Sequence, residues 1–587
     1  MALQPHSTAP HEVEVVVVGG GPTGLSAAIA LGRLGVSTLL VERRATTSTH
    51  PRGHVENGRT MELFRLWGVE KEVRAQGLPY TFLGGVAFMT RMAGIELGRI
   101  SFAEDSEWLM GPDGKGPAGL SSTPQDRLEP ILLARAQACD SVTTRFGWEV
   151  TDLTQDDDSV TVTLHDDEGH QDTITARYAF CADGPRSPAR ERLGVGVEGP
   201  GAVGSQLGIY FHADLSETVD ANRNALYWLY NPEVQGVIIS LDGDRRWHLL
   251  FAYDADTESI EDFPPERCEQ IVRGLVGRDD VDLDVRSVLP WRMRAAVAER
   301  FRVERVFLGG DAAHTMPPTG GMGMNTGIGD AHNLAWKLHA VLRGIADPAL
   351  LDTYETERMP VGRRNTENSL SNARTMVESG LAGILVNDPE GFAAIEEPRG
   401  APIRERMAAA IPGQLEHFSF DGLSFGYAYD SAALVPDGTP ETPSGVGDYV
   451  PSARPGSRAP HVWLSRDGEQ VSTIDLSDGR MVVLSADRGW VDAARAVAQH
   501  RAVPLDAFLV GGDDADLTDT PGTWAHKYGV GPTGAVLIRP DGHVAWRCPR
   551  ADGHRQRQVD RVLDAVMGHH TPADDVATAS ERPPAVR

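Results

Sequence analysis

Residues 12–42 read EVEVVVVGGGPTGLSAAIALGRLGVSTLLVE, and this stretch decides the fold class. Val13–Val18 is an apolar, β-branched run of the kind that forms a buried parallel strand. A helix-like segment, Thr23–Leu34, follows the glycines, and a second apolar strand, Ser37–Val41, ends in Glu42. A strand, a turn, a helix and a strand within about 30 residues predict an α/β unit with a parallel sheet.

The turn inside this unit, Gly19-Gly20-Gly21-Pro22-Thr23-Gly24, matches the pattern GxGxxG. Gly19 permits a tight turn, Gly21 lets the backbone approach a pyrophosphate, and Gly24 lets the helix pack on the strand. The phosphate charge would meet the positive end of the helix dipole. Glu42 ends the next strand, where a carboxylate can accept hydrogen bonds from an unphosphorylated ribose. A turn that serves only close packing is the alternative, but this context favours a Rossmann-like site for FAD or NAD.

A second glycine-rich segment, far along the chain, favours FAD. Arg305–Leu308 has the pattern of a short strand that runs into Gly310-Asp311, and a loop with two prolines and three glycines follows, Pro317–Asn325. Asp311 can bind the hydroxyls of a ribitol chain. The loop opens a helix whose free N–H groups suit the negative charge of a reduced flavin. Gly323, Met324 and Asn325 are therefore candidate flavin contacts, with an ordinary helix cap as the alternative.

Length and composition exclude several classes of function. A chain of 587 residues is too long for one core and predicts two or three domains. The formal net charge of −28 argues against nucleic acid and against an anionic membrane as partners. The four cysteines are scattered without a CxxC pair, so no disulfide framework and no metal site are expected. No apolar run approaches the ~20 residues of a membrane span, and we expect a cytoplasmic protein.

The pattern changes twice along the chain. Ser205–Asp254 contains strand-length segments of period two and predicts a mostly antiparallel sheet. A linker rich in Pro, Gly and Ser, Val435–Pro460, precedes a compact α/β pattern. The predicted domains are a FAD-binding domain in two parts (1–200, and 301–435 with a helical extension), a substrate-binding sheet domain (201–300), a C-terminal domain (436–568) and a disordered tail (569–587).

Three motifs in order resemble those of the single-component flavin-dependent aromatic hydroxylases, whose fold is that of para-hydroxybenzoate hydroxylase. They are GxGxxG, a DG motif in residues 181–190 (CADGPRSPAR), and the GD motif at Gly310-Asp311. Residues 325–338 (NTGIGDAHNLAWKL) also match the family's helix after the GD motif. The resemblance covers essentially the whole chain. It is greatest to the phenol hydroxylase branch, with 2,4-dichlorophenol 6-monooxygenase and 2-hydroxybiphenyl 3-monooxygenase, and the polyketide-tailoring hydroxylases share the architecture.

The resemblance implies both α/β and α+β architecture. A Rossmann-like FAD-binding domain would be interleaved with a mostly antiparallel β-sheet substrate domain, and a thioredoxin-like α/β domain would follow at the C-terminus. That last domain contains Cys548 but no CxxC pair. We therefore expect a structural or oligomer-contact module rather than thiol chemistry, and homo-oligomer formation stays open.

The resemblance also implies the cofactors and their contacts. It implies non-covalent FAD, NADPH or NADH as a transient electron donor, and O2. Together they would hydroxylate a phenol, a pyridinol or an aromatic polyketide through a flavin C4a-hydroperoxide. Arg52 and Gln125 should lie against the FAD, and Asp183 should serve flavin and nicotinamide, unless it is only a turn residue. Arg43 is either a pyrophosphate partner or a solvated charge. The expected cofactor residues are Gly19, Gly21, Gly24, Glu42, Arg43, Arg52, Gln125, Asp183, Asp311, Gly323, Met324 and Asn325.

His54, two residues after Arg52, is the candidate catalytic base. A phenolate is a better nucleophile than a neutral phenol, and a histidine with a pKa near ~6.5 can accept the phenolic proton. Related phenol hydroxylases carry a His or an Asp at the matching place, and a structural histidine is the alternative. His314, inside the GD motif, is expected to pack and hydrogen-bond in the flavin loop. The candidate substrate contacts are Tyr227, Trp228, Trp291 and Pro318.

Other functions stay open from the sequence. The same flavoprotein could perform a Baeyer–Villiger insertion or an epoxidation on a polyketide, although a ring-activating base at His54 counts against the former. A non-enzymatic FAD-binding scaffold is a further alternative, which an intact flavin loop disfavours. The sequence does not name the aromatic substrate, the position hydroxylated, or the choice between NADH and NADPH.

Overall fold

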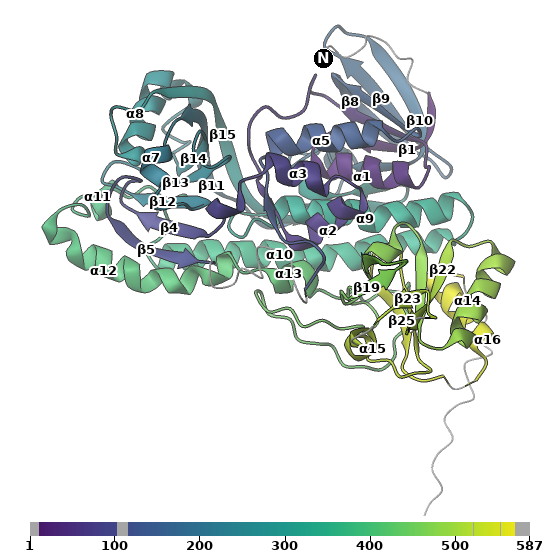
Figure 1. The fold of residues 1–587 in the computed structure, drawn as a ribbon. Coiled ribbons are helices and arrows are strands. Elements are labelled where there is room, and N and C mark those ends of the chain that lie inside the picture. Colours follow the sequence, from purple (N-terminus) through teal and green to yellow (C-terminus); the bar gives the residue numbers. More distant parts are fainter. Residues whose placement is uncertain (1–10, 103–114, 513, 520–521, 552, 570–587) are drawn as a thin grey trace, which may run out of the picture.

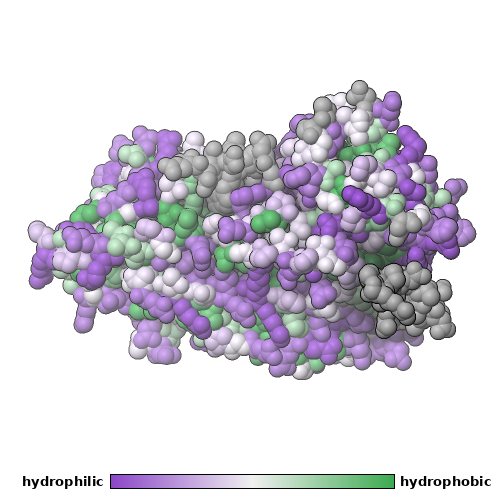
Figure 2. All heavy atoms as spheres, turned by 90° about the horizontal axis from the view of Figure 1, so that it is seen from below, coloured by the Kyte–Doolittle hydropathy of each residue, from purple (hydrophilic) through white to green (hydrophobic). Residues whose placement is uncertain are grey.

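The computed structural model describes residues 11–102, 115–512, 514–519, 522–551 and 553–569, so the predicted disordered tail lies, beyond residue 569, outside the described residues. Figure 1 shows two sheets side by side above two long helices, α9 (Gly323–Leu342) and α10 (Thr353–Glu378). The C-terminal part of the chain packs below these helices. Among the described residues, no helix combines the length and the apolarity needed to cross a bilayer. The face drawn in Figure 2 is mostly hydrophilic, with apolar side chains in small separate groups.

The first sheet is built around β1 (Glu12–Val18), which pairs in parallel with β2 (Thr38–Glu42) and β10 (Gln171–Cys181). Helix α1 (Pro22–Arg33) makes the crossover between β1 and β2. Val15, Val16 and Val17 are fully buried, as the apolar run predicts. The chain returns to this sheet after building the second one, at β16 (Arg302–Val303) and β17 (Val306–Leu308), while β7 (Val142–Phe146), β8 (Trp148–Gln155) and β9 (Val160–Asp166) complete it.

The second sheet has the strand order β18-β15-β11-β14-β13-β12-β4-β5. Its pairs are antiparallel except for β12 with β4. β4 and β5 of this sheet lie well within residues 1–200, which the sequence assigns to the first part of the FAD-binding domain. The bounds are β4 (Gly85–Met89), β5 (Glu96–Ser101), β11 (Val197–Ala213), β12 (Leu226–Tyr230), β13 (Gln235–Ser240), β14 (Arg246–Ala252), β15 (Leu283–Ala298) and β18 (His314–Thr315).

Successive side chains of a strand point to opposite faces, and the strand register therefore sorts the residues of the second sheet. Tyr210 pairs with His248, and Gly208 pairs with Leu250 and Leu289. We call the face that carries these side chains the His248 face, and it also carries Trp228, Gln206 and Trp291. The opposite face, the Trp247 face, packs against α8 (Pro265–Val276).

The C-terminal domain is a mixed sheet with the order β20-β19-β23-β22-β21-β24-β25 and helices packed on it. This is the α/β pattern predicted after the linker. The bounds are β19 (Trp463–Arg466), β20 (Glu469–Ser472), β21 (Met481–Ser485), α14 (Arg488–Arg501), β22 (Leu505–Gly511), β23 (Leu517–Thr518), α15 (Thr523–Tyr528), β24 (Ala535–Ile538), β25 (Val544–Cys548) and α16 (Arg555–Val566).

A buried network of charges joins the C-terminal domain to α9 and α10. Arg539, just after β24, donates to both carboxylate oxygens of Glu357 in α10, at 2.6 and 2.8 Å. Lys337 of α9 donates to Glu357 at 2.7 Å, and the indole of Trp336 donates to Asp541 at 3.3 Å. The four charged side chains are at most 2% exposed. Burial alone would raise the pKa of Glu357, but Arg539 and Lys337 hold it well below its ordinary value. The domain is therefore an integral part of the fold.

Cys548→Ser should leave turnover within about twofold of wild type. The Cys548 thiol is buried at the end of β25 and donates to the carbonyl oxygen of Arg550 at 3.0 Å, and a serine hydroxyl can make the same bond. Steady-state turnover and thermal unfolding of the purified variant provide the check. A large loss of turnover at normal stability would contradict a purely structural role for this thiol.

Candidate active site

The glycine turn after β1 is packed closely at Gly19 and Gly24 and has open space at Gly21. A Cβ on Gly19 would lie 2.3 Å from the carbonyl oxygen of Ala182, and one on Gly24 would lie 1.9 Å from that of Gly19, so both positions require glycine. Gly19 also has a φ of +106°. No atom lies within 4 Å of a Cβ on Gly21, which stands at the N-terminus of α1. This is the geometry that close approach of a pyrophosphate to the helix needs.

Glu42, at the end of β2, is tied to this turn. It accepts a hydrogen bond from the Gly20 backbone at 2.6 Å, and its other oxygen accepts from the Arg44 backbone and side chain at 3.0 and 2.8 Å. Burial alone would raise the pKa of Glu42, but these hydrogen bonds hold it below its ordinary value. The carboxylate is thus ionised at the place where the sequence predicts a ribose partner.

Three polar side chains around the turn are accessible and have no ion-pair partner among the described residues: Arg43, Arg52 and Asp311. Arg52 and Asp311 belong to distant loops, yet each shifts the pKa of the other. Burial raises the pKa of Asp311, although the nearby His314 and Arg52 partly offset this by lowering it. Arg52 and Asp311 thus lie close enough to interact, and the exposed side chains of Arg43, Arg52 and Asp311 offer one acid and two guanidinium groups around the turn.

The sequence assigns the Asp311 carboxylate to the ribitol hydroxyls of FAD, and we therefore expect Asp311→Ala to weaken FAD retention by the loss of one such hydrogen bond. The expected cost is about 1–3 kcal/mol in binding. The flavin dissociation constant of wild type and variant, measured by fluorescence on reconstitution, tests this. Asp156→Ala, in an exposed turn, is the control and should bind as wild type does. Equal FAD affinity in the Asp311 variant would remove this residue from the site.

Asn325 joins two loops of the site. Its Oδ1 accepts from the Asn57 backbone at 2.9 Å and from the Thr60 hydroxyl at 2.6 Å. Its Nδ2 donates to the carbonyl oxygens of Val55 and Gly321, at 2.9 and 2.8 Å. The side-chain amide of Asn325 is thus bonded to protein and attaches the loop before α9 to α2 (Gly58–Leu66), which leaves its backbone N–H for the predicted cofactor contact.

Two other predicted cofactor residues, Met324 and Gln125, both contact Gly53. The Met324 sulfur would lie 3.7 Å from a Cβ on Gly53, and the Gly53 backbone donates to Gln125 Oε1 at 3.5 Å. Gln125 opens α5 (Gln125–Gln137), and its own backbone donates to the carbonyl oxygen of Gly53. Gly323 and Pro318, also expected here, lie half-buried in the loop that opens α9. The Arg52 loop thus rests against both segments that the sequence assigns to the flavin.

Asp183 of the DG motif accepts hydrogen bonds at the start of α6 (Pro188–Arg192), whose N-cap is Ser187. Its oxygens accept from the Ser187 hydroxyl at 2.6 Å and the Ala189 backbone at 3.1 Å, and burial raises its pKa. Arg190 of the same motif donates to the carbonyl oxygen of Ala312 at 2.9 Å. Asp183 thus orders this turn, and Arg190 attaches the turn to the loop of the GD motif; whether Asp183 also serves flavin and nicotinamide stays a prediction.

Sequence reasoning assigned no role to Asp330 of α9. Its carboxylate binds the loop of the GD motif, residues 310–314, which we call the GD loop. Its carboxylate accepts from the Gly310 backbone at 3.1 Å, from His314 Nε2 at 2.8 Å and from Arg358 Nε at 2.7 Å. All three side chains are buried. His314 thus packs and hydrogen-bonds within the loop, as predicted. The only sequence signal for Asp330 is its place in the GIGD run of the helix.

The candidate aromatic contacts divide between the two faces of the second sheet. Trp228 and Trp291 lie on the His248 face, and Trp291 is 37% exposed. Tyr227 lies on the Trp247 face and is 1% exposed, with its hydroxyl bonded to the carbonyl oxygen of Asn222 at 2.7 Å. Tyr227 is thus a core side chain on the face opposite to Trp228 and Trp291.

His54 is half-buried in the loop of residues 50–54, which we call the flavin-side loop, and it lies near the His248 face. Its Nδ1 lies 3.1 Å from the Ser122 hydroxyl, and its Nε2 makes no hydrogen bond to another described residue. Burial lowers the pKa of His54 to about 4, and the ring is close enough to His248 to shift its pKa as well. At physiological pH the ring is neutral, with a lone pair free to accept a proton.

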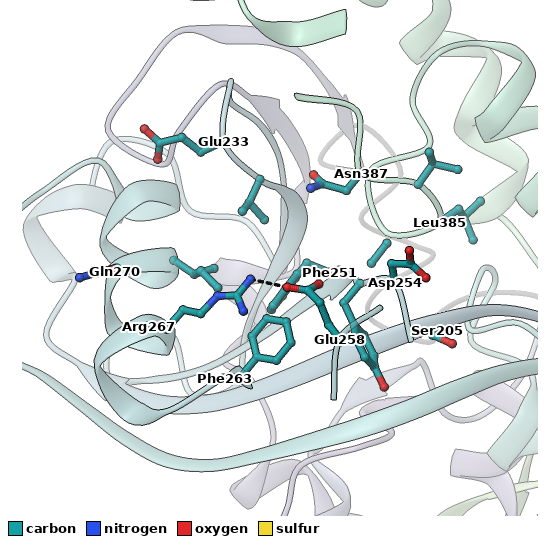
Figure 3. Close-up of a pocket in the computed structure, with 15 residues that line it drawn as sticks. Ser205, Glu233, Phe251, Asp254, Glu258, Phe263, Arg267, Gln270, Leu385 and Asn387 are labelled. Atoms are coloured by element: carbon teal, nitrogen blue, oxygen red, sulfur yellow. Dashed lines mark hydrogen bonds and ion pairs between the residues drawn. The ribbon is translucent and has the colours of Figure 1, made fainter. Parts of the chain in front are cut away.

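A pocket of about 570 Å³ lies elsewhere, beside α8 and the segment 385–387 (Figure 3). Its wall includes Ser205, Phe251 and the ion pair of Arg267 with Glu258, whose nitrogen and oxygen are 2.7 Å apart. Ser205 and Phe251 belong to the Trp247 face by their register. The pocket is thus on the far side of the sheet from His54.

Comparison with known proteins agrees with this geometry. Residues 12–369 match the model of the FAD binding domain, and residues 452–569 match that of the C-terminal domain of aromatic-ring hydroxylases. A putative polyketide hydroxylase of Streptomyces halstedii is 38% identical, over 92% of this chain and 93% of its own. A 2,4-dichlorophenol 6-monooxygenase of Delftia acidovorans is 35% identical, over 95% and 99%.

Solved structures give the same result. The flavin-dependent monooxygenase PieE, in complex with FAD and substrate, superimposes with a TM-score of 0.87 at 34% identity, over 95% of this chain and 99% of its own. Aklavinone-11 hydroxylase with FAD and aklavinone gives 0.81 at 36% identity, over 96% and 100%. With both domain models matched and relatives covered over nearly their whole length, this chain belongs to the FAD-dependent aromatic-ring hydroxylases.

Proposed function

We propose that this enzyme hydroxylates a phenolic ring of a fused-ring aromatic polyketide, with NADPH or NADH as electron donor. Relatives that span nearly the whole chain are named as a polyketide hydroxylase and as an aklavinone 12-hydroxylase. The observation that carries the proposal is the position of His54. Its free Nε2 stands between the Arg52 loop and a sheet face that carries two tryptophans.

FAD, when bound, supplies the redox chemistry and the oxygen transfer. The residues described here supply its position. The turn at Gly21 and the guanidinium groups of Arg43 and Arg52 suit the pyrophosphate, and Asp311 suits the ribitol chain. Glu42 is ionised and suits the adenosine ribose.

His54 would accept the phenolic proton at Nε2. The ring is neutral at physiological pH, and its Nδ1 is held by Ser122. A proton moved from the phenol to His54 leaves a phenolate, whose carbon is a far better nucleophile than that of the neutral ring. The negative charge of this phenolate would in turn raise the pKa of His54.

Substrate-stimulated NAD(P)H oxidation, with the product identified, tests the proposed function. The panel contains fused-ring phenolic polyketides, simple phenols and ketones without a phenolic hydroxyl. We expect the polyketides to stimulate oxidation most and to gain one oxygen as a ring hydroxyl. A gain of oxygen as an ester would point to Baeyer–Villiger insertion instead. Stimulation by simple phenols alone would refute the polyketide assignment.

A further inference from the structure

One histidine of the flavin-side loop reaches across to the substrate sheet. His50 lies two residues before Arg52, and its Nδ1 is 2.7 Å from the hydroxyl of Ser287 in β15. Its Nε2 is 3.2 Å from Nε2 of His248 in β14, and the two rings meet edge to face with centroids 4.9 Å apart. The loop and the His248 face are therefore joined by a single imidazole.

The sheet is shaped to receive this ring. Gly208 of β11 lies between Ser287 and His248, on the strand that pairs with both of theirs. A Cβ at position 208 would lie 2.8 Å from His248 Nε2 and 3.3 Å from His50 Nε2. His50 is 5% exposed and His248 is 2% exposed. Three adjacent strands thus form a socket for His50 that any side chain at Gly208 would fill.

The hydrogen bonds in the socket have a preferred direction. Burial, with help from Arg52, lowers the pKa of His50 to about 4, and burial keeps His248 far below its ordinary pKa. Both rings are neutral, so each carries one proton. His248 Nδ1 is buried and has no hydrogen-bond partner among the described residues, and a bare lone pair there costs less than an unpaired N–H. His248 therefore donates from Nε2 to His50, and His50 donates from Nδ1 to Ser287.

We propose that His50, seated in the socket of Ser287, Gly208 and His248, is the positioning residue that fixes the Arg52–His54 loop against the substrate sheet. This inference rests on the proposed function, because its consequence is the alignment of the phenolic ring with the flavin. A misplacement of about 1 Å can cost ~10²-fold in rate. The socket should therefore control how much of the NAD(P)H oxidised ends in product.

Four variants separate positioning from simple stability. His248→Leu removes the donor to His50, and His248→Gln keeps a donor near the Nε2 position. Gly208→Ala places a methyl group in the space that His50 and His248 occupy, without removing a polar group. His212→Leu, on the same face of β11, is the matched control, since His212 bonds only the Tyr210 hydroxyl, at 2.8 Å, among the described residues. Product formed per NAD(P)H, the anaerobic rate of flavin reduction, FAD affinity and thermal unfolding are measured for each.

His248→Leu and Gly208→Ala should each lower product per NAD(P)H by at least fivefold. Their FAD affinity and reduction rate should stay within about twofold of wild type. His248→Gln should recover at least half of the wild-type ratio, and His212→Leu should match wild type. Wild-type coupling in both disruptive variants would overturn the proposal. Loss of FAD from both at normal thermal stability would overturn it too, since the socket would then serve flavin retention.

Failure of the proposed function gives a different result. If wild type hydroxylates none of the phenols offered, that function is refuted, whereas the socket can still be judged from the visible circular dichroism of the bound flavin. His248→Leu and Gly208→Ala should then change this spectrum, and His248→Gln and His212→Leu should leave it unchanged. An identical spectrum in all four variants would refute the positioning role by itself.

Discussion

Arg539→Met should lower the free energy of unfolding by about 3–5 kcal/mol, the largest stability effect that we expect from any single change in this chain. The substitution keeps most of the side-chain volume but removes the guanidinium group that binds both oxygens of Glu357 and the carboxylate of Asp541, and both carboxylates stay buried. Denaturant unfolding followed by tryptophan fluorescence measures the loss. FAD content should fall with it, because Glu357 and Asp541 hold α9, whose first turn contains Gly323 and Met324, two residues that the sequence assigns to the flavin.

The control is Arg480→Met in the same domain. Arg480 also makes two hydrogen bonds to one carboxylate, that of Asp506, at 2.7 and 2.9 Å. Both side chains of this pair are at least 36% exposed, and such a pair contributes at most about 1 kcal/mol. Equal losses in the two variants would contradict the view that burial makes the Arg539 network decisive.

The same network fixes the sign of a pH effect. The pKa values of Glu357 and Asp541 lie below their ordinary values in the folded chain, so the unfolded chain binds more protons near pH 4. The stabilisation from these carboxylates is thus fully present above about pH 5 and is lost as the pH falls. The stability difference between wild type and Arg539→Met should therefore shrink on acidification.

The parts of the fold predicted well from sequence are those whose signal is local. β1, α1 and β2 match the predicted segments to within one or two residues, because a β-branched run, a glycine turn and an apolar helix follow one another directly. The membership of β4 and β5 in the second sheet was not predicted. That pairing joins strands more than 100 residues apart, and nothing within residues 85–101 records it.

Within the site, the missed features depend on register and on contacts between distant loops. All but one of the β12 side chains are buried, so the burial of its residues does not say whether Tyr227 or Trp228 faces the flavin side. A shift of one residue in the strand pairing would exchange the faces on which Tyr227 and Trp228 lie. Asn325 and His50 carry no local signal either, because their partners lie on segments far away in the chain. The chemistry of the glycine turns was readable because it depends on backbone geometry alone.

His54→Ala should slow oxygen transfer by about 10²–10⁴-fold while anaerobic reduction of the flavin stays near the wild-type rate. The reduction step does not involve the phenolic proton, whereas attack by the ring carbon depends on it. NAD(P)H consumption should therefore uncouple from product and yield hydrogen peroxide. His54→Gln is the matched variant, since its amide can accept a hydrogen bond near the Nε2 position but cannot take a proton at neutral pH. If His54 is the base, His54→Gln should slow oxygen transfer as much as His54→Ala does. If His54 only positions the ring, His54→Gln should keep a rate near that of wild type.

The pH dependence gives an independent check on the same residue. With its pKa near 4, His54 is neutral at every pH between about 6.5 and 9, so the coupling ratio of wild type should be flat there. In His54→Ala the phenolate must come from solvent. Its fraction rises tenfold per pH unit below a phenol pKa near ~10, and the rate of oxygen transfer should rise with it. A flat profile with full coupling in His54→Ala would show that the substrate loses its proton to another group or binds already ionised.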